Sequence, residues 1–243
     1  EVAILGIRSL LSIPKRPWEI RALLTQVLEQ GNRAIGLSFV MSGFAGLVLT
    51  FQFGEGLQRF GARQYIGQLT ALALLRELMP VLTALILGGR IAAGIAAELG
   101  AMVASEQVDA IRALGADPLK KLAMPRIVAA TVVLPLLTVL GDVVGVVAGM
   151  GVARLEFEVP AHWYLLTVRD FLLVSDFLSG VVKSAVFGLV LGVVACDAGL
   201  RSRGGTEGVG RATTSAVVVT SLTVIILDYL LSRMLFPSPG VGR

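Results

Sequence analysis

The feature that most constrains the fold is the segment 34–53, twenty consecutive residues without a charged side chain. An α-helix rises 1.5 Å per residue, so a helix of this length is about 30 Å long and matches the hydrocarbon core of a bilayer. Lipid offers no partners for backbone N–H and C=O groups, and a helix pairs them within the segment. The sequence therefore predicts a transmembrane helix here.

Four further apolar segments follow, at residues 66–89, 127–153, 177–196 and 212–236. Only 16% of the residues are charged, against about 25% in an ordinary soluble domain. The loops are short and we find no internal repeat. We therefore expect an all-α integral membrane protein with five spans, and interpret residues 1–243 as a single domain.

Residues 17–30 form a candidate amphipathic helix ahead of the first span. Apolar residues recur there at helical spacing, Pro17 suits a helix start, and Trp18 suits the membrane interface. We expect this helix to lie on the membrane surface. The alternative is the start of a soluble helix packed against a partner.

Lysine and arginine residues predict the orientation, because cytoplasmic loops carry more of them. With a cytoplasmic N-terminus, the inner side holds thirteen of these residues and the outer side six. The inner set is Arg8, Lys15, Arg16, Arg21, Arg33, the five of segment 90–126, Arg201, Arg203 and Arg211; the outer set is Arg59, Arg63, Arg154, Arg169, Arg233 and Arg243. Segment 90–126 is therefore expected in the cytoplasm and the C-terminus on the outer side.

Several functional classes lack their sequence signatures. There is no P-loop motif for ATP and no common hydrolase motif. The single histidine, His162, excludes a multi-histidine metal site and has no evident catalytic partner, and the single cysteine, Cys196, excludes an intrachain disulfide. The net charge of +4 comes from basic residues at span ends, so it does not indicate nucleic-acid binding.

The cytoplasmic segment 98–115 has the features of a docking element. Residues 105–114 predict a short helix whose apolar side holds Val108, Ile111 and Leu114 and whose polar side holds Glu106, Asp109 and Arg112. Gly115 is a helix stop, and Asp117-Pro118 can start the next helix. Coupling helices of ABC permeases, which receive motion from an ATPase, have this form, and so do ordinary interfacial helices.

Four charged residues lie inside predicted spans: Arg76, Glu77, Lys183 and Asp228. A charge at the centre of a membrane helix costs about 2.5–3.5 kcal/mol on insertion scales, so each should be paired or face a polar cavity. Two acids and two bases can cancel in an ion-pair network that only fixes helix packing. Alternatively, they form a polar patch that handles a charged lipid headgroup.

Small residues at four-residue spacing predict close helix contacts. One row is Gly141, Gly145 and Gly149, another is Gly188 and Gly192, and a third is Gly89, Ala93, Ala97 and Ala101. The third row is a candidate dimer surface or an intrachain contact.

A series of motifs, in order along the chain, resembles the MlaE (YrbE) permease family. They are LLRELMP (74–80), GR (89–90), AELGAM (97–102), EQVDA (106–110), LGADPL (114–119), PR (125–126), VKSAVFG (182–188), GRATTSAVV (210–218) and LDYLL (227–231). The resemblance covers roughly residues 20–236.

The resemblance implies a homodimeric permease of an ABC transporter in the bacterial inner membrane. Its expected partners are two cytoplasmic ATPase subunits, a periplasmic ring of MCE domains and phospholipid, with a small cytoplasmic accessory subunit as a further candidate. Such systems move phospholipids between the inner and outer membranes and maintain outer-membrane asymmetry. The chain itself is expected to be no enzyme and to bind no cofactor, with ATP and Mg²⁺ on the ATPase.

The resemblance also implies roles for particular residues. A lipid-binding cavity near the dimer axis would involve Arg76, Glu77, Leu49, Leu57 and Phe60, with Lys183 and Asp228 as further intramembrane charges. The ATPase-coupling region would involve Glu98, Glu106, Gln107, Asp109 and Arg112. Two positions depart from the family pattern: Met79 stands where glycine is frequent, and Phe60 stands where a cavity tyrosine is described.

Two other classes compete with an ABC lipid permease. A secondary transporter or channel would also use buried charges, here Arg76, Glu77, Lys183 and Asp228, but it predicts paired repeats that the sequence lacks. An intramembrane lipid enzyme would need a reactive group of residues, and His162 stands alone in a predicted outer loop.

Overall fold

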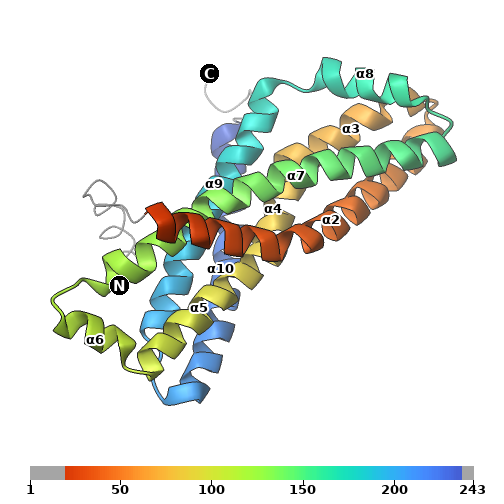
Figure 1. Cartoon of the computed structure of the whole chain (residues 1–243). Helices are drawn as coiled ribbons and strands as arrows, with labels where there is room; N and C mark the ends of the chain where they lie inside the picture. Colours follow the sequence, from red (N-terminus) through yellow and green to blue (C-terminus); the bar gives the residue numbers. More distant parts are fainter. Residues whose placement is uncertain (1–19, 237–243) are drawn as a thin grey trace, which may run out of the picture.

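The computed structural model describes residues 20–236 and is built from helices (Figure 1). Five helical segments are long and apolar enough to cross a membrane: Arg21–Arg59, Arg63–Ala104, Leu119–Glu156, Val174–Leu200 and Gly205–Leu235. The predicted all-α membrane protein with five spans is confirmed. Each segment extends beyond the apolar run that predicted it, because a helix continues through charged residues once it leaves the lipid.

The first helix, α2 (Ile20–Arg59), is continuous over 40 residues. The predicted surface helix 17–30, from residue 20 onward, runs into the predicted span 34–53 without a break; residues 17–19 lie outside the described part. No proline separates the two segments, and one glycine, Gly31, costs a helix only about 1 kcal/mol. At 1.5 Å per residue α2 is about 60 Å long, so its ends extend beyond the hydrocarbon core.

The second span is a helix with two wide turns. A short turn (Arg63–Tyr65) leads into α3 (Ile66–Ala73), a π-helical turn η2 (Leu74–Leu78), α4 (Met79–Leu82), a second π-turn η3 (Thr83–Leu87) and α5 (Gly88–Ala104). Proline at position 80 removes a backbone donor from the helix interior, and π-turns are one way to accommodate such a break. The sequence pattern did not predict these turns.

The remaining described residues form three long helices and several short ones. They are α6 (Gln107–Ala113), the π-turn η4 (Leu119–Ala123), α7 (Met124–Glu156), α8 (Ala161–Phe171), α9 (Val174–Leu200) and α10 (Gly205–Leu235). Helices α6 and α8 lie at opposite ends of the bundle (Figure 1).

Helix α8 was not predicted; its segment appeared in the sequence only as an outer loop. Tyr164 anchors it, because this side chain is fully buried against α3 and α7 in a cluster with Ile66 and Ala153. Burial raises the pKa of the Tyr164 phenol above its ordinary value of 10.0, so the group is neutral where it packs. Trp163 and Phe171 of the same helix are about half exposed, at 48% and 59%.

The predicted glycine rows are confirmed as packing positions. A Cβ on Gly46 of α2 would collide with the carbonyl oxygen of Gly145 of α7, so the two backbones approach as closely as glycine permits. Gly188 and Gly192 of α9 lie in the same way against the α7 backbone. Gly89 faces Val217 of α10, so the third row begins as an intrachain contact.

The core and the outer surface are both apolar. The main core cluster joins residues of α2, α5, α7, α9 and α10, and includes Ile91, Leu134, Phe187, Leu191 and Val224. Large apolar side chains also cover the outside: Phe44 is 64% exposed, Val143 60% and Ile226 62%. An outer surface of this kind is stable against acyl chains, as expected for membrane spans.

A charged layer between the spans as the candidate functional site

The site begins with a backbone carbonyl to which Pro80 cannot donate. In a regular helix the N–H of residue 80 would bond to the C=O of Arg76, four residues earlier, but proline has no N–H. The Arg76 carbonyl instead accepts a hydrogen bond from Lys183 Nζ of α9, at 3.1 Å. The break in one span is thus repaired by a charged side chain from another, as membrane helices require.

Lys183 is the centre of the layer. It is fully buried, yet its ammonium lies 2.6 Å from Glu77 Oε2 and 3.2 Å from Asp228 Oδ1, and donates to the Ser232 hydroxyl at 2.6 Å. Ser232 also lies 3.1 Å from both Glu77 oxygens. Three spans therefore meet at one buried cation, which satisfies the expectation that intramembrane charges pair.

Arg76 points to a different partner. Its Nε and Nη2 atoms both donate to Asp176 Oδ1, at 2.8 and 2.6 Å, and its guanidinium lies 4.1 Å from the centre of the Phe236 ring. Asp176 is 2% exposed and also accepts the N–H of Leu173, which caps the start of α9. Adjacent residues on a helix diverge, so Arg76 and Glu77 reach different neighbours.

The sequence missed Asp176 because it lies one residue before the predicted span 177–196. The sequence offered two acids and two bases that could cancel, and the structure holds three carboxylates, Glu77, Asp176 and Asp228, against Arg76 and Lys183. The five side chains also differ in exposure. Lys183 and Asp176 are buried, whereas the exposed fraction is 46% for Glu77, 32% for Arg76 and 23% for Asp228. The layer is therefore paired internally, and three of its side chains are partly exposed. We call these five side chains the charged layer.

The other predicted cavity residues lie at different depths. Leu49 packs beside Leu74, Leu75 and Met79. These three residues flank Arg76 and Glu77 in the sequence. Leu57 packs beside the Tyr164 cluster, and Phe60 is 84% exposed in the turn after α2. A single chain does not gather them around Arg76, so their role in a cavity stays a prediction.

The predicted docking segment forms an exposed tip. Helix α6 begins at Gln107, and Glu106 precedes it with a left-handed backbone, φ 59°. Val108 is 3% exposed while Leu114 is 85% exposed. The predicted polar residues Asp109 and Arg112 form an exposed pair at 2.8 Å.

Both predicted ends of this segment have the expected chemistry. Gly115 has a φ of 76°, its N–H bonds to Arg112 O, and Ala116 N–H bonds to Ile111 O, which is a Schellman ending. The Asp117 carboxylate accepts the N–H of Leu119 at 3.0 Å and starts the next turn.

Glu98 lies apart from α6. It pairs with Arg126 of α7 at 3.0 Å, and Arg126 also donates to the carbonyl of Leu122. Glu98 lines a cavity between α2 and α5 rather than the exposed tip. Its assignment to ATPase coupling therefore stays a prediction. The contact that the structure shows for Glu98 is its ion pair with Arg126, so any role in coupling would be indirect.

The residues considered for metal binding do not cluster in the described part of the chain. His162 is exposed on α8, and no group of three histidine, cysteine or acidic side chains within residues 20–236 could hold a metal ion. Asp142 of α7 is 5% exposed, and its Oδ1 has no hydrogen-bond partner among those residues.

Comparison with known proteins assigns the chain. Residues 23–234 match the protein family described as Permease MlaE. A probable ABC transporter permease protein of Rickettsia typhi is 40% identical over 96% of this chain and 90% of its own length. A probable ABC transporter permease protein of Synechocystis is 36% identical over 90% of this chain and 84% of its own. The protein TRIGALACTOSYLDIACYLGLYCEROL 1, chloroplastic, of Arabidopsis thaliana is 36% identical over 98% of this chain and 68% of its own. The chain is a multi-pass membrane protein that belongs to the MlaE family of ABC transporter permeases.

Proposed function

We propose that this permease moves phospholipids between the inner and outer membranes and so maintains outer-membrane lipid asymmetry. The observation that carries the proposal is the charged layer: Arg76, Glu77 and Asp228 are partly exposed at a depth where the surrounding surface is apolar. A phospholipid has the same division, a charged headgroup on apolar chains. The Arabidopsis relative adds support, because its name contains that of a diacylglycerol lipid.

The proposed assembly is a homodimer in the bacterial inner membrane. Two ABC ATPase subunits, which would bind ATP and Mg²⁺, lie on the cytoplasmic side, with a small accessory subunit as a further candidate there. A ring of MCE domains lies on the periplasmic side. The excess of lysine and arginine on one side supports a cytoplasmic N-terminus and a periplasmic C-terminus.

Reconstitution tests the function against a secondary transporter or channel. The purified chain should be dimeric and hydrolyse no ATP, and the complex in proteoliposomes should transfer labelled phospholipid only when ATP is present. Transfer that follows an imposed ion gradient in the absence of the ATPase would support the secondary transporter instead. Labelling either the donor or the acceptor membrane also determines the direction.

Charge reversal on the α6 tip tests the docking proposal. Glu106→Lys and Asp109→Lys should each weaken ATPase association by roughly tenfold, because a rim charge that loses its complement costs about 1 kcal/mol or more. Both side chains are exposed, so folding should be unaffected. Pull-down of the ATPase measures the change.

Glu156→Lys is the matched control, since Glu156 is an exposed glutamate at the far end of α7. Normal association and normal coupled transport in both α6 reversals would show that this helix only rests on the membrane surface.

A further inference from the structure

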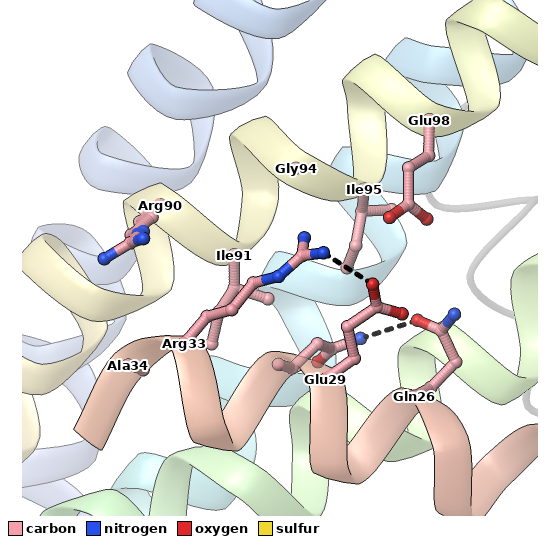
Figure 2. Close-up of a pocket in the computed structure, with 10 residues that line it drawn as sticks. Gln26, Glu29, Arg33, Ala34, Arg90, Ile91, Gly94, Ile95 and Glu98 are labelled. Carbon is pink, nitrogen blue, oxygen red and sulfur yellow. Dashed lines mark hydrogen bonds and ion pairs between the residues drawn. The ribbon is translucent and has the colours of Figure 1, made fainter. Parts of the chain in front are cut away.

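A cavity of about 220 Å³ lies between the N-terminal part of α2 and α5, away from the charged layer. Its polar lining residues are Gln26, Glu29, Gln30 and Arg33 of α2 and Arg90 and Glu98 of α5. In Figure 2, Arg33 and Glu29 extend from α2 into the space beside α5, and Glu98 reaches toward the same space from the other helix. Apart from Glu98, which belongs to the predicted ATPase-coupling region, none of these residues has a role in the transport function proposed above.

The cavity lies at the ends of two apolar runs. Ala34, the first residue of the run 34–53, and Arg90, which follows the apolar run 66–89, both line it. From Arg90 to Glu98 the helix rises about 12 Å at 1.5 Å per residue. The headgroup layer occupies the outer part of a bilayer that is about 40–45 Å thick, just beyond its ~30 Å core. This layer is about 5–8 Å thick on each side, so a cavity that begins at the ends of the apolar runs spans the headgroup layer and continues beyond it.

Part of α2 turns polar side chains toward the cavity and large apolar side chains outward. Gln26, Glu29 and Gln30 are half-buried toward α5, whereas Leu24 and Leu28, on the outer side of the helix, are 56% and 69% exposed. A helix end in water would turn its polar residues outward. This arrangement is stable if apolar lipid surrounds the helix and a polar group occupies the cavity.

The charges favour an anionic occupant. Glu29 pairs with Arg33 at 2.7 Å and Glu98 with Arg126 at 3.0 Å, so these four charges balance. Arg90 also lines the cavity, is exposed, and has no hydrogen bond or ion pair within residues 20–236. Arg90 is therefore available to an anion, and the negative group that diacyl phospholipids share at this depth is the phosphodiester, which arginine binds well.

The floor of the cavity is Gly94. A Cβ at this position would meet nothing within 4 Å, so the space is open above the α5 backbone. A volume of about 220 Å³ is below the roughly 300 Å³ at which pockets begin to hold a whole drug-sized ligand. It suits a headgroup whose acyl chains remain outside.

We infer that the cavity between α2 and α5 binds the phosphate-bearing headgroup of a phospholipid in the adjacent leaflet, with Arg90 as its anionic contact. Under the orientation proposed above, this is the cytoplasmic leaflet. The site is separate from the charged layer, and its occupancy requires neither ATP nor a partner subunit.

The test is crosslinking of the purified full chain in nanodiscs to a phosphatidylethanolamine that carries a photoreactive group on its headgroup. Crosslinks should map to peptides covering residues 21–34 and 88–98. Gly94→Leu fills the cavity and Arg90→Ala removes its free cation, so each should lower the yield at these peptides about tenfold, as expected for one charge-assisted contact. Arg90→Lys should restore part of the yield.

Two matched controls lie near the C-terminal end of α7, outside the cavity lining. Gly151→Leu places the same side chain where a Cβ also meets open space, and Arg154→Ala removes another exposed arginine. Both should crosslink as the unchanged chain does. Equal yields for Gly94→Leu and Gly151→Leu would overturn the inference. So would full competition by soluble glycerol phosphate at the concentration of the lipid, or equal crosslinking by a diacylglycerol probe without phosphate. Because no ATPase is present, these results do not depend on the outcome of the transport assay.

Discussion

Replacing Lys183 by methionine should destabilise the folded chain more than any other single side-chain change in the charged layer. Methionine keeps most of the length of the side chain but leaves Glu77 and Asp228 facing each other without the cation between them. It also removes the hydrogen bond that Lys183 donates to the Arg76 carbonyl, an acceptor that Pro80 cannot satisfy. Removing one partner of a buried ion pair costs about 3–5 kcal/mol. Unfolding in mixed micelles measures the loss.

Two further variants isolate the cause. Lys121→Met removes an exposed lysine from η4 and should change stability by less than about 0.5 kcal/mol. Adding Glu77→Gln and Asp228→Asn to Lys183→Met removes the unpaired carboxylates and should restore most of the stability. If Lys183→Met alone unfolds no more readily than Lys121→Met, the layer is not a structural ion-pair network.

The second large effect is expected at Gly46, where α2 and α7 come into backbone contact. Gly46→Ala places a methyl group against the carbonyl oxygen of Gly145, which cannot move without displacing the helix. Overpacking of this kind costs about 1–3 kcal/mol, and more where the backbone resists. We expect a loss of about 3 kcal/mol or more, seen as a lower unfolding midpoint and a lower yield of folded protein.

Gly43→Ala, on the same helix, is its control. A Cβ at Gly43 would lie 3.9 Å from Val144, an ordinary contact, so this change should stabilise the helix by up to about 1 kcal/mol. Equal stabilities for the two variants would mean that α2 and α7 do not approach as described.

The spans could be predicted because lipid imposes a simple rule. Uncharged runs such as 34–53 must be helical and must be about twenty residues long. The same rule says nothing beyond the hydrocarbon core, so it could not predict that α2 continues from residue 20 or that α8 forms. Tyr164 holds α8 through contacts with α3 and α7, and such contacts between distant segments are invisible in a local pattern.

Four of the five side chains of the charged layer were predicted from the sequence, and Asp176 was not. Charges inside apolar runs are conspicuous, so Arg76, Glu77, Lys183 and Asp228 could be identified from the sequence. Which charge meets which depends on the π-turn at Leu74–Leu78 and on the start of α9. Asp176 was not predicted because a charged residue at the end of an apolar run is ordinary. Only the folded structure shows that it forms an ion pair with Arg76.

The central claim is that the charged layer contacts the headgroup of the transported lipid. The most direct measurement compares the unchanged chain with the double variant Arg76→Met, Asp176→Asn, in the reconstituted complex. The double change removes both charges of one pair, so no buried charge is left alone. The asparagine oxygen can still accept the Leu173 N–H that caps α9, so the protein should fold and dimerise normally.

Bound phospholipid per folded dimer and the rate of ATP-driven transfer are then measured together. If Arg76 holds the lipid phosphate, both should fall about tenfold, the value of one lost charge-assisted contact. Normal occupancy and a normal transfer rate in a well-folded double variant would contradict the claim and leave the charged layer with a purely structural role.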